Sequence, residues 1–185
     1  MAKIQIVSSY LMTFLNILIA WFIVPPFIIW GFTDTKIAQH FLTHTNPIET
    51  PGGWVYLNEV VWTPLSKSIF FGSAVLAIIP ILYGLVVLKA IFRNYRLGEI
   101  FTTENARHYR TIGVLFFVNA LAIKPLTQML DVLAVTLSNP PGQRCLRIMF
   151  GTPNLENLFY GFVILVISWA MLEASKLQED QKLVI

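Results

Sequence analysis

IFFGSAVLAIIPILYGLVVL, the stretch from Ile69 to Leu88, contains no charged residue. As an α-helix it is about 30 Å long, which equals the thickness of the hydrocarbon core of a bilayer. Pro80 lacks an amide hydrogen and is expected to bend this helix one turn before the proline. The stretch therefore predicts a membrane-spanning helix.

Three more apolar stretches lie at about residues 6–24, 112–137 and 158–172. Pro25 and Pro26 disfavour continuing the first helix. A cleaved signal peptide is the alternative for that stretch, but it is longer than a signal core and no small-residue cleavage site follows it. The sequence thus predicts an all-α fold, an integral membrane four-helix bundle that forms a single membrane domain over residues 1–185.

The composition agrees with a membrane protein. Of the 185 residues, 56% are hydrophobic and 12% are charged, and the mean hydropathy is +0.66. There is too little polar side chain to coat a soluble globule, and the same composition argues against disorder and against a direct nucleic-acid partner. Cys145 is the only cysteine, which excludes an intrachain disulfide; it is expected to pack as a small apolar residue.

Lysine and arginine are distributed unevenly between the two sides of these spans. One side carries Lys3, Lys89, Arg93, Arg96, Arg107, Arg110, Lys176 and Lys182, and the other carries Lys36, Lys67, Arg144 and Arg147. Because positive charge accumulates on the cytoplasmic side, both termini, a hairpin at 89–111 and a tail at 173–185 are predicted to be cytoplasmic.

The predicted outside loop, residues 31–68, is rich in proline and aromatic residues. Within it, 34–45 is compatible with one short helix, which would place His40 and His44 on one face at the spacing of two metal ligands. Two ligands do not make a site, so we expect ordinary interfacial histidines and no metal. The loop is expected to be a cap lying on the lipid headgroups, with a ligand- or partner-facing cap as the alternative.

Polar residues inside the third span are the strongest sign of a special role, because ionisable groups are costly in hydrocarbon. Lys124, Gln128 and Asp131 share one helix face, which is expected to point inward. They form either a binding site or proton path, supplemented by Asn16 and Asn119, or a structural pair. No enzyme motif is present, so no catalytic residue and no cofactor is predicted.

The predicted hairpin has strong local signals. Gly98 is a natural helix C-cap, Thr102 or Thr103 can cap the next helix, and Glu104 falls in its first turn. Arg107 and Arg110 follow at the start of the third span, where they can meet anionic headgroups or the acidic tail. The tail ends in three apolar residues, 183–185, and is expected to dock on this basic hairpin through Leu177, Glu179, Leu183 and Ile185.

The hairpin and the tail together resemble a bacterial family of four-span membrane proteins filed as a domain of unknown function, number twenty-nine seventy-five. The residues that carry the resemblance are Gly98-Glu99-Ile100-Phe101-Thr102, Glu104-Asn105, the stretch 110–113, and Leu177, Glu179, Leu183 and Ile185 in the tail. The resemblance covers roughly the second half of the chain. It implies a multi-pass protein of the bacterial inner membrane with no established activity.

Two functions follow from these patterns as hypotheses. The first is a non-enzymatic sensor, regulatory or accessory subunit that binds a protein partner through the hairpin and tail. The alternative is a small oligomeric transporter or channel that uses the Lys124 and Asp131 face, with a second copy of the chain as its partner. In both, the lipid bilayer is the surrounding partner.

Overall fold

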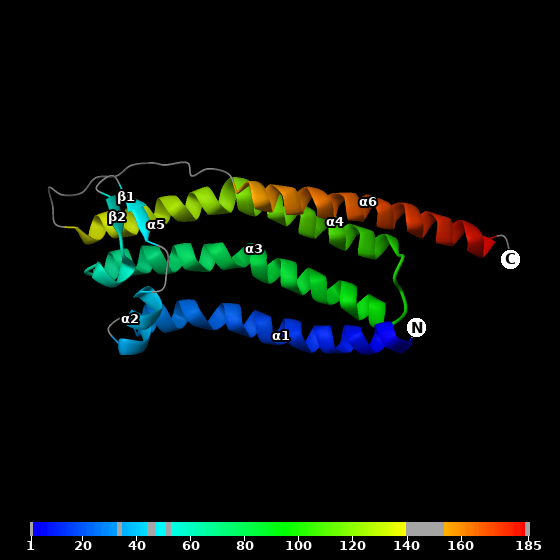
Figure 1. Cartoon of the computed structure of the whole chain (residues 1–185), viewed down its shortest axis with the longest axis horizontal. Helices are drawn as coiled ribbons and strands as arrows, with labels where there is room; N and C mark the ends of the chain where they lie inside the picture. The colour runs from blue at the N-terminus through cyan, green and yellow to red at the C-terminus, as the bar shows by residue number, and fades with distance from the viewer. Residues whose placement is uncertain (1, 33–34, 44–46, 51–52, 140–153, 184–185) are drawn as a thin grey trace. The chain divides into compact units, whose positions relative to one another are not determined.

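The computed structural model describes residues 2–32, 35–43, 47–50, 53–139 and 154–183. Its long helices are α1 (Ala2–Gly31), α3 (Pro64–Arg96), α4 (Thr103–Val118), α5 (Lys124–Ser138) and α6 (Leu155–Leu183), and a π-helical turn, Asn119–Ile123, joins α4 to α5 (Figure 1). In this described part, four helical stretches are long and apolar enough to cross a membrane: Ile4–Ile28, Pro64–Arg96, Thr103–Ser138 and Leu155–Gln181. The predicted four-helix membrane fold is therefore confirmed.

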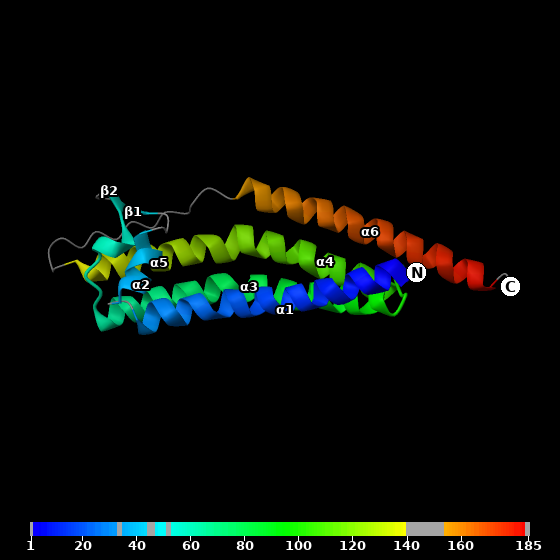
Figure 2. The ribbon, with the colours of Figure 1, turned by 60° about the horizontal axis from the view of Figure 1, so that its bottom comes forward.

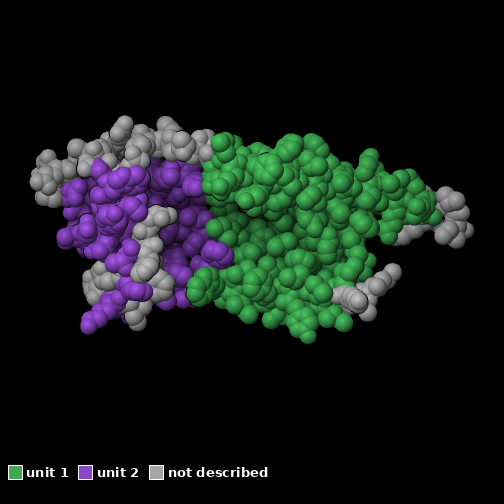
Figure 3. Space-filling view, in the orientation of Figure 1, with its two compact units in different colours: residues 1–21, 79–121, 154–185 green, residues 22–78, 122–153 purple. Residues whose placement is uncertain are grey.

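Contacts within the chain group it into two compact units (Figure 3). Unit 1 contains residues 1–21, 79–121 and 154–185, and unit 2 contains residues 22–78 and 122–153. In unit 1, the start of α1, the connection between α3 and α4, and the end of α6 lie at the same end (Figure 1). The predicted topology requires this arrangement; the assignment of that end to the cytoplasm remains a prediction from the charge count.

Two helices start or end differently from the prediction. The expectation that Pro25 and Pro26 end the first helix is wrong, because α1 continues to Gly31. Pro26 is buried in unit 2, where Phe27 packs edge-to-face on Phe71 with ring centroids 5.4 Å apart, and this packing offsets the lost backbone bonds. α3 starts at Pro64 rather than near 69, because Thr63 and Ser66 cap it reciprocally.

Pro125 shapes the connection between α4 and α5. Proline lacks the amide hydrogen that would bond the carbonyl four residues earlier, and its ring crowds that turn. The chain widens into the π-helical turn just before Lys124 and then continues as α5 without leaving the helical path. The third predicted span is thus one continuous helical stretch that contains a π-helical turn.

In unit 1, α4 and α6 pack closely along their length (Figure 1, Figure 2). Small buried residues recur at every seventh position along both helical stretches: Ala106 and Gly113 on α4 with Ala120 in the π-helical turn, and Gly161, Ser168 and Ser175 on α6. The Ser168 hydroxyl donates to the Ala106 carbonyl over 2.8 Å. Small residues let two helix backbones approach in a membrane, and here they create the tightest helix pair of the unit.

In unit 2, the predicted outside loop is a folded cap. It contains α2 (Lys36–Thr43) and two three-residue strands, β1 (Ile48–Thr50) and β2 (Gly53–Val55), which pair antiparallel. Its core consists of Leu42 and Leu57 packed with Val135 of α5. The short helix was predicted, but the pair of strands β1 and β2 was not, because strands this short carry no usable hydrophobic period. Trp54 and Tyr56 are exposed on the cap, as the headgroup interpretation requires.

Candidate functional site

The connection between α3 and α4 begins with a glycine turn. Gly98 has φ +86°, a conformation that costs glycine little and other residues more. The amide of Gly98 donates to the Tyr95 carbonyl over 3.1 Å, and the amide of Glu99 donates to the Asn94 carbonyl over 3.0 Å. The predicted C-cap at Gly98 is confirmed; this glycine lies two residues after Arg96, the last residue of α3.

The start of α4 is capped by Thr102. Its hydroxyl accepts from the Asn105 amide over 3.2 Å, and its carbonyl accepts from the Ala106 amide over 3.1 Å. Of the two caps that the sequence allowed, the structure uses Thr102. Glu104 lies in the first turn, where a carboxylate interacts favourably with the helix dipole.

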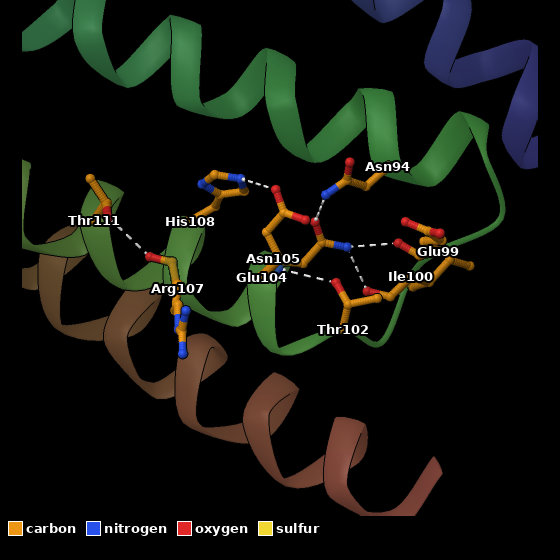
Figure 4. A network of polar contacts seen from close by, with 9 residues as sticks. All are labelled: Asn94, Glu99, Ile100, Thr102, Glu104, Asn105, Arg107, His108 and Thr111. Carbon is orange, nitrogen blue, oxygen red and sulfur yellow. Dashed lines mark hydrogen bonds and ion pairs between the residues drawn. The ribbon is translucent and has the colours of Figure 1, made fainter. Parts of the chain in front are cut away.

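The side chain of Asn105 ties both halves of the connection together (Figure 4). Its Nδ2 donates to the carbonyls of Glu99 and Ile100 over 2.7 and 2.9 Å. Its Oδ1 accepts from Nδ2 of Asn94 over 2.9 Å. Asn105 is 0% exposed and Asn94 is 3% exposed, so water does not compete for these bonds. The residues of this buried network hold the backbone from 94 to 106 in one conformation.

The role of Asn105 and the involvement of Asn94 were not predicted. Asn105 was singled out only through the family resemblance, and Asn94 was not singled out at all. The available signal was an asparagine in the last turn of a helix, followed four residues later by a C-cap glycine. A short amide side chain at that position, inside an otherwise apolar and basic helix end, indicates a local bond to the turn.

The surface of the α3–α4 connection, outside the buried network, is basic. Arg93, Arg96, Arg107 and Arg110 are exposed, and no acidic side chain pairs with them in the part of the chain that the structure describes. Figure 4 shows Arg107 pointing away from the asparagines. Glu104 instead lies 3.4 Å from Nε2 of His108, and Glu99 and Phe101 are exposed. The four arginines are therefore free to meet a partner or lipid headgroups.

The tail does not dock as predicted at the two positions that can be checked. α6 continues as a helix to Leu183, and both Leu177 and Glu179 are exposed. Leu177 follows the buried Ser175 by two residues, which turns it to the opposite face of α6. The side chain of Leu183 and all of Ile185 lie outside the described residues. Glu173 and Lys176 form an ion pair on α6, with Nζ of Lys176 3.1 Å from Oε2 of Glu173.

The three polar residues of the third span do not share one environment. Asp131 is half-buried in unit 2, within hydrogen-bonding reach of the buried Ser73, whose hydroxyl also lies 3.1 Å from the Thr127 carbonyl. Lys124 and Gln128 are exposed, so the expectation that they point inward is wrong. The reason is that the cap packs against Val135, one turn beyond Asp131, and covers only that end of the face.

The two asparagines expected to supplement that face lie in unit 1. Asn16 accepts from Nζ of Lys89 over 2.8 Å and so links α1 to α3. Asn119 lines an apolar cavity between α3 and α4. His44 and Cys145 lie outside the described residues, so the predictions for them are not tested.

Comparison with known proteins adds one relationship. A family described as "Protein of unknown function (DUF2975)" matches residues 16–185. The match includes the connection and the tail that carried the resemblance, and it also extends through the cap of unit 2, beyond the second half of the chain. Neither the curated proteins nor the solved structures contain a match.

Proposed function

We propose that this chain, which belongs to the DUF2975 family of unknown function, is a non-enzymatic membrane subunit. It would regulate or assist a protein partner. The partner would bind the surface formed by Arg107 and Arg110 at the start of α4. The proposal rests on one observation: the exposed arginines lie directly beside the buried hydrogen-bond network of Asn94 and Asn105.

Rigidity matters because binding costs conformational entropy. A connection that already has one backbone conformation loses little freedom when a partner binds it. Exposed cations that form no ion pair with an acidic side chain in the described part of the chain attract an acidic surface and speed its encounter. The expected partner is therefore a protein with an acidic patch on the same side of the membrane, which we assign to the cytoplasmic side of a bacterial inner membrane.

Reversing both charges, Arg107→Glu with Arg110→Glu, is expected to reduce the amount of co-purified partner at least tenfold, because attraction becomes repulsion at the binding surface. The measurement is crosslinking in the native membrane, purification in a mild detergent, and quantitative mass spectrometry. Membrane insertion should stay at the wild-type level.

A charge-matched control is Lys36→Glu with Lys67→Glu in unit 2, which changes the net charge equally at residues outside the proposed surface. This control should retain the partner. If the Arg107 and Arg110 variant also retains it at the wild-type level, or if no stoichiometric partner is found at all, the proposal is wrong.

A second candidate, a small oligomeric transporter, is favoured by a different observation. Lys124 and Gln128 are exposed within an apolar span, where contact with lipid tails is costly. Contact with a second copy of the chain would remove that cost and could place Lys124 and Asp131 beside a shared path. Four spans alone rarely enclose a path, so this candidate requires an oligomer.

For this candidate, Lys124→Met should abolish both the oligomer and the ion flux of reconstituted vesicles, because the polar contact between copies is lost. Light scattering of the detergent-solubilised protein gives the mass, and a pH-sensitive or potential-sensitive dye gives the flux. Lys36→Met, an exposed lysine outside the spans, is the matched control. A Lys124→Met protein with unchanged mass and unchanged flux rules out transport through this face.

A further inference from the structure

A cavity of about 370 Å³ lies inside unit 1, between α3 and α4, with a residue of α6 in its wall. Its main lining residues are Pro80, Gly84, Leu88, Ile112, Phe116 and Ile164. The volume falls in the range of small-molecule sites, and the walls are almost wholly apolar. An apolar group that fills this space gains dispersion contacts with its walls.

The cavity has the depth of one lipid leaflet. Along α3 it extends from Pro80 to Leu88, which is about 12 Å at 1.5 Å per residue. Half of a hydrocarbon core of about 30 Å is close to that length. Pro80 lies near the middle of the predicted span 69–88, so the cavity extends from the middle of the bilayer toward the surface at the α3–α4 connection.

The two polar residues of the lining lie at opposite ends: Tyr109 lies at the end where a lipid headgroup would be, and Asn119 lies at the end near the middle of the bilayer. Tyr109 lines the cavity, and its hydroxyl is 2.9 Å from the hydroxyl of Tyr95. Tyr95 follows Leu88 by seven residues and so shares its face of α3. Tyrosines of this kind are typical of the membrane–water interface.

The charges near the cavity indicate which kind of lipid headgroup would bind there. Between 89 and 111 the chain carries five lysines and arginines against Glu99 and Glu104. Arg93 and Arg96 follow the cavity end of α3 by one to two turns and are exposed. Clustered cations next to a membrane span attract anionic lipid.

We propose that this cavity holds one acyl chain of an anionic phospholipid, drawn from the leaflet that meets the α3–α4 connection. The phosphate lies near the Tyr95 and Tyr109 hydroxyls and the arginines at 93 and 96. Gly84 makes room for the chain, because it has no side chain and the nearest atom to a methyl built there, on Leu115, is 3.8 Å away. The site is separate from the proposed partner surface at Arg107 and Arg110, and a lipid would stay bound there whether or not a partner is present.

Gly84→Leu tests the proposal, because its side chain fills the cavity from α3. The matched control is Gly72→Leu, on the same helix, exposed and with nothing within 4 Å of the added carbon. The full chain is exchanged into detergent with phosphatidylglycerol or phosphatidylcholine of identical chains, and native mass spectrometry counts the lipids retained. Wild type and Gly72→Leu should retain one phosphatidylglycerol per chain, while Gly84→Leu should retain at least tenfold less.

Phosphatidylcholine should be retained several-fold less than phosphatidylglycerol by wild type, and Arg93→Gln with Arg96→Gln should remove that preference. Ile164→Phe, which narrows the cavity from α6, is a second filling variant in case Gly84→Leu fails to fold by thermal melting. The proposal is overturned if folded filling variants retain as much phosphatidylglycerol as Gly72→Leu, or if wild type does not distinguish the two lipids. Preferential retention of added palmitate would identify a free fatty acid as the ligand and would also overturn it.

Discussion

Replacing Gly113 with leucine is expected to force α4 away from α6 and to destabilise unit 1 by roughly 2–3 kcal/mol. A Cβ at position 113 would lie 2.9 Å from Cγ and Cδ2 of Leu165 and 3.1 Å from the Gly161 carbonyl oxygen. Leu165 can change rotamer, but the Gly161 oxygen belongs to a helix backbone. The added side chain therefore has no place unless the two helices separate.

The measurement is the unfolding equilibrium in mixed micelles, followed by tryptophan fluorescence. Gly72→Leu adds the same side chain where nothing lies within 4 Å, so its free energy of unfolding should stay close to wild type. The free energy of unfolding of the Gly113→Ala protein should lie between those of the Gly113→Leu and Gly72→Leu proteins. Equal stability of the Gly113→Leu and Gly72→Leu proteins would show that α4 and α6 do not approach closely at Gly113.

Replacing Asn105 with aspartate is expected to cost roughly 2–4 kcal/mol and to open the α3–α4 connection. The two side chains have nearly the same shape, but the ionised aspartate has no hydrogen to donate. The carbonyls of Glu99 and Ile100 lose their partner and face a negative charge at a site that is 0% exposed. The acceptor for Asn94 remains, so the effect combines the two lost donor bonds with the cost of the buried charge.

Hydrogen exchange reports this change directly. In the aspartate variant, the amides from 98 to 106 should exchange much faster than in wild type, and thermal stability in detergent should fall. Arg107→Gln makes the same change in net charge at an exposed position of the same helix end and should do neither. If Asn105→Asp exchanges at the wild-type rate, the buried network does not hold the connection.

Sequence and structure agree best where a feature is local. The four spans follow from local hydropathy, and the turn at Gly98 and the cap at Thr102 follow from bonds that reach only a few residues along the chain. The exception among local predictions is Pro25-Pro26. There, packing of Phe27 on Phe71 in unit 2 outweighs a local rule.

The candidate site was predicted in outline. The basic hairpin was identified from its charges, caps and family resemblance, and Arg107 and Arg110 are exposed as that interpretation requires. The bond from Asn94 to Asn105 was not foreseen, because it joins two helix ends across a turn whose geometry must be known first. The prediction that Lys124 and Gln128 point inward was wrong for a related reason. One helix face can be covered by neighbouring segments at one end and exposed at the other.

The sequence by itself determined that this chain has four helices long and apolar enough to cross a membrane, and a basic connection with a glycine C-cap and a threonine N-cap, because hydropathy and capping act between near neighbours. Only the tertiary structure decided that Gly113 lies on Gly161, that Ala106 accepts from Ser168, and that Gly84 borders a cavity. Those facts depend on the register of helices far apart in sequence. Register is set by which side chains fit when whole helices pack, and no local pattern contains that information.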